Sequence, residues 1–140
     1  MAIFTKKFKD IENRILVTTN ISFASKRMKA NTLVDTGATI SCISKSVAKK
    51  LKLQPIGIDK VSTPSGTAVL SKYLLNISFK KDMVFKNIFV LESEIGNQGI
   101  DLLIGMDILN KNDIMISNYD NHTQFSMRYP ASENLEFQYC

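Results

Sequence analysis

One short stretch of this chain combines residue types that can do chemistry at a fixed position. It reads Thr32-Leu33-Val34-Asp35-Thr36-Gly37-Ala38-Thr39, so an apolar strand end is followed by an acid, a hydroxyl and a glycine. A tight turn there would hold the Asp35 carboxylate at a fixed angle as the chain leaves the sheet. The stretch has no second acid, histidine or set of metal ligands near it. We therefore expect neither a metal nor another cofactor.

The elements around Asp35 are predicted from local periodicity. Apolar residues two or four positions apart in residues 14–23 indicate a strand with one buried face, and a polar turn at 25–27 returns the chain as a strand over 29–34. This hairpin ends at Asp35. A short β-prone segment, 40–43, follows, and Ser44 then stands where an N-cap belongs, before a two-turn helix. Cys42 within that segment is interpreted as a buried small side chain rather than a nucleophile.

The second half of the chain predicts further strands. Residues 56–63 and 68–80 form a long hairpin around Pro64-Ser65-Gly66-Thr67, which is either a surface feature or a mobile cover over a cleft. An apolar run over 83–91 predicts a strand covered on both faces. A buried strand from Ile100 leads to Gly105 and a short helix, and 113–129 form a last hairpin. After Pro130 there is no clear pattern, although Leu135 and Phe137 fit a terminal strand.

Composition places the chain among single globular domains. It has 140 residues, of which 44% are hydrophobic and 22% charged, and a formal net charge of +5. The basic clusters at 6–9 and 26–29 are interpreted as solvated strand ends and turns, and a nucleic-acid-binding β-domain is the less favoured alternative. Neither a signal-peptide pattern nor an apolar run of about 20 residues is present. We expect a cytoplasmic protein with no membrane or nucleic-acid partner.

Two motifs in a fixed order resemble those of the retropepsin-like aspartic proteases. Leu33-Val34-Asp35-Thr36-Gly37-Ala38-Thr39 is followed, after the glycine-tipped hairpin, by Leu102-Leu103-Ile104-Gly105-Met106-Asp107-Ile108-Leu109. A lone Asp-Thr-Gly is weak, but its setting makes the match more specific. The resemblance implies a mainly β fold: a retropepsin-like acid protease barrel in one domain, 1–140, with a core at 13–129, a flap hairpin and one or two short helices. Residues 130–140 would be a dimer strand or a tail.

The same resemblance implies an aspartic endopeptidase in which Asp35 is catalytic. Thr36 would lock two such loops together through hydroxyl-to-backbone hydrogen bonds, and Gly37 would let backbone approach the substrate. Peptide hydrolysis through an activated water needs one carboxylate as general base and a second, protonated one. Asp101 and Asp107 lack the Thr-Gly context and are assigned to a strand start and a helix turn. The second acid should therefore be Asp35 of another copy, in a two-fold homodimer.

The resemblance also suggests how a peptide or protein substrate would bind. An extended peptide would lie as an added strand in a cleft lined by Ala38, Ser65, Gly66, Thr67 and Ile104. Met106 stands where viral enzymes often carry an arginine, so an ion pair that supports the catalytic loop is expected to be missing. The main alternative is a catalytically silent, protease-like dimer that binds peptides or assembles a complex.

Overall fold

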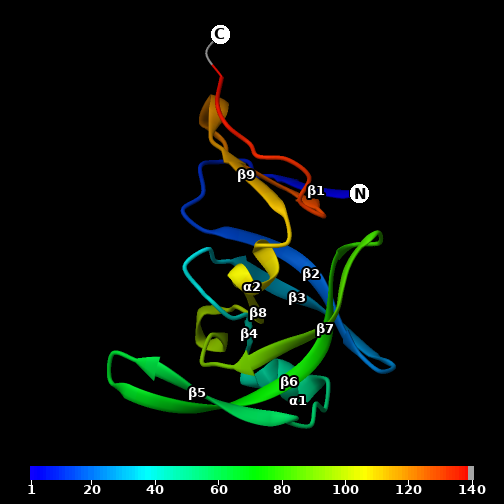
Figure 1. Cartoon of the computed structure of the whole chain (residues 1–140), viewed down its shortest axis with the longest axis vertical. Coiled ribbons are helices and arrows are strands. Elements are labelled where there is room, and N and C mark those ends of the chain that lie inside the picture. The colour runs from blue at the N-terminus through cyan, green and yellow to red at the C-terminus, as the bar shows by residue number, and fades with distance from the viewer. Residues whose placement is uncertain (139–140) are drawn as a thin grey trace.

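Six strands close on themselves around the main hydrophobic core (Figure 1). The computed structural model describes residues 1–138. The sheet order is β2-β3-β8-β4-β7-β6-β5, and an additional pairing between β2 and β6 closes the barrel and leaves β5 outside it. The strands are β2 (Ile15–Phe23), β3 (Lys26–Val34), β4 (Cys42–Ile43), β5 (Gly57–Thr63), β6 (Gly66–Lys80), β7 (Met83–Glu92) and β8 (Leu102–Ile104).

The first hairpin confirms the prediction made from the spacing of apolar residues. In β2 the buried positions alternate with exposed ones, as expected for a strand with one face on the core. The register pairs Phe23 with Lys26 and Ile15 with Val34, so the connecting turn contains only Ala24 and Ser25. Strand β3 therefore begins three residues earlier than predicted and still ends directly before Asp35.

The helices also follow from local signals. In α1 (Lys45–Lys50) the Ser44 hydroxyl accepts a hydrogen bond from the Val47 backbone N–H at 3.3 Å, as an N-cap does. Lys49 and Lys50 occupy its last turn, where they complement the helix dipole. The four-residue α2 (Met106–Leu109) follows β8, and the short 3₁₀ helix η1 (Gly96–Gln98) precedes it. No helix in residues 1–138 is both long and apolar enough to cross a membrane.

The β5–β6 hairpin extends beyond the barrel (Figure 1). Its strands pair from Gly57 opposite Lys72 to Thr63 opposite Gly66, which leaves Pro64 and Ser65 as a two-residue turn. Only the part of β6 from residue 72 onward also pairs with β7. Consequently its alternate positions from Tyr73 to Phe79 are buried, whereas Val69, in the outer part of the hairpin, remains 55% exposed.

Strand β7 corrects one prediction. It was expected to be covered on both faces, but its buried residues alternate with exposed ones along most of its length. Met83 and Phe85 point into the core, whereas Phe89 is 53% exposed and lies under the ammonium of Lys72, 4.7 Å from the ring centroid. No element covers this outer face in the described chain, so an apolar run alone did not distinguish a central strand from a half-buried one.

A second, antiparallel sheet joins the two ends of the chain. Its order is β1 (Ala2–Lys7), β10 (Gln124–Tyr129) and β9 (Asp113–Ser117), and the 3₁₀ helix η2 (Tyr119–Asn121) connects the last two. Phe4 packs edge-to-face on Phe79 of the barrel, with ring centroids 5.5 Å apart. The fold thus begins at Ala2, not at residue 13. Residues 131–138 contain no strand, so Leu135 and Phe137 do not form the terminal strand expected for them.

Candidate active site

The chain leaves the barrel at Asp35, in a turn that is hydrogen-bonded to β8. Strands β3 and β8 run parallel, with Val34 opposite Ile104, and the Asp35 N–H donates to the Ile104 carbonyl oxygen at 2.9 Å. The turn then closes through a bond from the Ala38 N–H to the Asp35 carbonyl at 3.2 Å. The backbone on both sides of the carboxylate is therefore fixed.

The carboxylate itself is oriented by the glycine that follows it. The Gly37 N–H donates to Asp35 Oδ1 at 2.9 Å, and a Cβ at Gly37 would lie 3.2 Å from that same oxygen. Asp35 is half-buried, while Thr36 and Gly37 are exposed. The turn therefore presents an exposed Thr36 beside a half-buried acid whose Oδ1 is bonded to backbone.

Gly105 and Met106, which directly follow β8, support the C-terminal part of the Asp35 turn. The Met106 N–H donates to the Ala38 carbonyl at 2.8 Å, so a backbone bond ties the start of α2 to the turn. Gly105 lies so close behind it that a Cβ there would be 2.8 Å from the Ala38 oxygen and 3.1 Å from the Ile40 carbonyl carbon. The close backbone approach predicted for Gly105 is confirmed.

A buried hydroxyl and an acid form a clamp at the end of the turn. Asp107 accepts from the Ser41 hydroxyl at 2.7 Å through Oδ1 and from the Ser41 N–H at 3.0 Å through Oδ2. The Ser41 hydroxyl in turn accepts from the Gly105 N–H at 3.0 Å, and Ser41 has no exposed surface. The Ser41–Asp107 clamp braces the loop in a chain that carries Met106 and not an arginine at the position after Gly105.

The sequence only partly anticipated this clamp. Asp107 does serve the helix turn, because its Oδ1 also accepts from the Ile108 N–H at 3.0 Å. Its bonds to Ser41 span 66 residues and were not predicted. The available signal was a serine within an apolar, β-prone segment, since a buried hydroxyl needs a partner. Asp101 accepts from the Asn31 N–H at 2.8 Å just before β8, as its assignment to a strand start implies.

The other reactive side chains lie outside this arrangement. Burial, and secondly the negative charge of Asp107, raise the pKa of the Cys42 thiol, which favours the protonated, unreactive form. His122 is half-buried, and its Nδ1 lies 3.3 Å from the carbonyl oxygen of Asp120. In residues 1–138 no three His, Cys, Asp or Glu side chains are grouped so that they could hold a metal ion.

The structure separates the predicted substrate-contact residues into three places. Ala38 belongs to the Asp35 turn, whereas Ser65, Gly66 and Thr67 are exposed at the tip of the β5–β6 hairpin. There the Thr63 hydroxyl donates to the Gly66 carbonyl at 2.7 Å, and Gly66 has a φ of +126°, a region that favours glycine. Ile104 is fully buried behind the turn. This corrects the expectation that Ile104 lines a cleft.

Comparisons with known proteins agree with this architecture. A family model described as aspartyl protease matches residues 20–108. A retropepsin-like aspartic protease from Rickettsia conorii is 18% identical with a TM-score of 0.58, and the match covers 94% of this chain and 98% of that one. The Simian foamy virus (mac) protease is 20% identical with a TM-score of 0.52, over 69% and 92% of the two chains. No curated protein matches. The barrel has the retropepsin-like fold predicted from the sequence.

Proposed function

Since this chain belongs to the aspartyl protease family, we propose that it is an aspartic endopeptidase whose site contains two Asp35 carboxylates, one from each copy in a homodimer. The observation that carries the proposal is the Asp35 turn, in which backbone bonds from Gly37 and to Ile104 hold a half-exposed carboxylate. The sequence contains one Asp-Thr-Gly. A two-fold axis beside the turn would supply the second acid.

The chemistry of such a pair accounts for peptide hydrolysis. Two carboxyl groups a few ångströms apart share one proton, as the paired acids of aspartic proteases do, because both cannot ionise easily. The ionised Asp35 takes a proton from a water molecule while the oxygen of that water attacks the peptide carbonyl carbon. The protonated Asp35 of the other copy gives its proton to the carbonyl oxygen. The first Asp35 then passes its proton to the nitrogen while the second regains a proton from one hydroxyl of the intermediate, so the C–N bond breaks and yields a carboxylic acid and an amine.

The neighbouring residues would have distinct tasks in this reaction. The Thr36 hydroxyl is exposed and would reach the partner's turn, while Gly37 keeps the backbone open for a substrate. Ala38 and the hairpin tip, Ser65 to Thr67, would contact an extended peptide bound as an added strand. The β5–β6 hairpin would act as the flap that covers this peptide and excludes water.

The experiment that tests the proposal is cleavage profiling on a diverse peptide library. We expect cleavage by the wild-type protein and by Asp82→Asn, which removes an exposed acid from the β6–β7 turn. Asp35→Asn preserves the size of the side chain but cannot provide the general base, and cleavage should fall to background. Full cleavage by Asp35→Asn would refute the assignment. Peptide binding by the wild-type protein without cleavage would instead indicate the catalytically silent module.

A further inference from the structure

The positive charge of the chain is concentrated on two hairpins of the barrel. Residues 18–30 of the β2–β3 hairpin and residues 74–88 of the β6–β7 hairpin contain six of the 18 basic side chains and one of the 13 acidic ones. The other 12 basic and 12 acidic side chains cancel, so these two segments account for the whole net charge of +5. The six basic residues, all of them exposed, are Lys26, Arg27, Lys29, Lys80, Lys81 and Lys86.

Strand pairing brings the two segments together. Lys29 of β3 lies opposite Asn20 of β2, which in turn lies opposite Ser78 of β6. Arg27 follows two positions along on the same exposed face of β3. In Figure 1 the β2–β3 and β6–β7 turns both lie to the right of the barrel, whereas the tip of the β5–β6 hairpin lies to the left. We refer to the six basic residues as the lateral basic surface.

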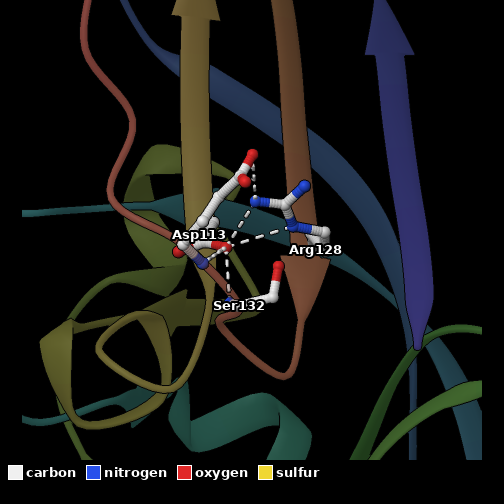
Figure 2. Close-up of polar contacts among 4 residues, drawn as sticks. Asp113, Arg128 and Ser132 are labelled. Atoms are coloured by element: carbon white, nitrogen blue, oxygen red, sulfur yellow. Dashed lines mark hydrogen bonds and ion pairs between the residues drawn. The ribbon is translucent and has the colours of Figure 1, made fainter.

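Most of these cations lack the acidic partners that neutralise other basic residues. Figure 2 shows the contrast with Arg128, whose guanidinium donates to the Asp113 carboxylate at 2.7 Å. In the lateral basic surface only Lys80 has an ion pair within the described chain, with Asp82 at 3.7 Å. Uncompensated like charges on neighbouring strands repel each other, and an anionic partner would relieve this repulsion.

We infer that the lateral basic surface binds an acidic segment of the protein substrate, outside the cleft that holds the scissile bond. This inference rests on the proposed function, because a peptidase must bind a polypeptide. Charge complementarity selects acidic side chains as the partner. A single-stranded nucleic acid fits less well, because its bases need aromatic surfaces on which to stack, and Phe23, at 39%, is the only exposed aromatic residue of the two segments.

The position of the surface predicts where the acidic segment lies in the substrate. Strand β3 runs from the lateral basic surface to the catalytic turn, so Lys29 and Arg27 precede Asp35 by six and eight residues. At about 3.3 Å per residue, these separations are about 20 and 26 Å. An extended substrate needs about six to eight residues to cover the same distance. We therefore expect the acidic segment to begin no closer than this to the scissile bond.

Binding of a labelled deca-glutamate peptide, measured by fluorescence anisotropy, tests the surface without a cleavable bond. We expect the wild-type protein to bind it more tightly than deca-glutamine and to lose affinity as the salt concentration rises. Arg27→Glu combined with Lys29→Glu should raise the Kd by about tenfold or more, because two attractions become repulsions. Arg27→Gln combined with Lys29→Gln should raise it less.

The matched control is Lys7→Glu combined with Lys9→Glu. It changes the net charge by the same amount at two exposed positions outside the lateral basic surface. We expect this control to keep the Kd for deca-glutamate close to the wild-type value. All of these substitutions replace exposed side chains, so the melting temperatures should match that of the wild type.

Cleavage kinetics test whether the surface serves the substrate. A peptide that the library identifies as cleaved is extended by five glutamates, which begin about seven residues from the scissile bond. It is compared with the same peptide extended by five glutamines. We expect the glutamates to lower KM by about tenfold and to leave kcat unchanged. Arg27→Glu combined with Lys29→Glu should abolish this gain without changing cleavage of the unextended peptide.

The outcomes separate this inference from the proposed function. Equal Kd values for the wild type and the Arg27→Glu, Lys29→Glu variant would overturn the inference while leaving the peptidase proposal standing. Tighter binding of a ten-nucleotide oligonucleotide than of deca-glutamate would do the same, as would a gain in KM that survives in the variant. Deca-glutamate binding that the variant loses, without cleavage of any library peptide, would support an acidic-polypeptide site and refute the peptidase.

Discussion

A methyl group at Gly105 would test how tightly the Asp35 turn is braced. Gly105 has a φ of −98° and a ψ of −172°, an extended conformation open to any residue, so alanine there meets no backbone strain of its own. The obstacle is the turn. A Cβ at Gly105 would lie 2.8 Å from the Ala38 oxygen, 3.2 Å from the Ala38 carbonyl carbon and 3.1 Å from the Ile40 carbonyl carbon.

The size of the effect follows from these distances. The Ala38 oxygen must retreat by about 0.6 Å, from 2.8 Å to the 3.4 Å at which ordinary contact begins, and it also accepts the Met106 N–H bond. Overpacking of this kind costs about 1–3 kcal/mol. For a domain of this size that lowers the melting temperature by about 3–10 °C. A displaced carboxylate would also reduce kcat, since a shift near 1 Å can cost about a hundredfold.

Calorimetry and peptide kinetics on Gly105→Ala would measure both effects. Gly57→Ala is the matched control, because a Cβ at Gly57 meets no atom within 4 Å. We expect Gly57→Ala to retain the melting temperature and kcat of the wild type. If Gly105→Ala also retained both, the turn would not be braced by close contact with β8 and α2, and the reasoning would be refuted. The melting temperature tests the packing even if no substrate is found.

Two further predictions concern acids that organise backbone. Asp107→Asn turns an amide donor toward the N–H or hydroxyl of Ser41. We therefore expect the free energy of unfolding, measured with urea, to fall by about 1–3 kcal/mol and kcat to fall as well. An unchanged unfolding midpoint would contradict the clamp. The hydrogen bond from the Ser132 N–H, and secondly the one from Arg128, lower the pKa of Asp113 below its ordinary value of 3.8. The Asp113 carboxylate therefore stabilises the fold fully at pH values above 3.8, and this contribution disappears as the pH falls through the folded-state pKa. The difference in melting temperature between wild type and Asp113→Asn should therefore be present at pH 7 and vanish in acid; a difference independent of pH would contradict this linkage.

The parts of the site that the sequence predicted are those with local causes. Period-two apolar residues located the hairpin that ends at Asp35, and Ser44 marked the start of α1 as an N-cap. Gly105 indicated that two backbone segments approach closely there. The resemblance of residues 102–109 to a motif of the retropepsin-like proteases placed this glycine against the Asp35 turn. Each of these signals operates within a few residues, so it survives without knowledge of the tertiary structure.

The parts that the sequence did not predict depend on contacts between distant segments. Strand β1 reads as a charged terminus, and only its pairing with β10, from Ala2 opposite Tyr129, makes it a strand. The Ser41–Asp107 clamp likewise joins positions 66 residues apart. The exposed face of β7 depends on the absence of a covering element in the described chain, which no pattern within β7 encodes.

The way the turn is braced explains why this chain can do without an arginine after Gly105. The bond to the Ala38 carbonyl comes from the Met106 backbone, so it does not depend on the side chain at that position. The acid of the clamp, Asp107, needs no cation, because it accepts three hydrogen bonds, two from Ser41 and one from the Ile108 N–H. The Met106 side chain is consequently free of any bracing role and remains 37% exposed at the start of α2.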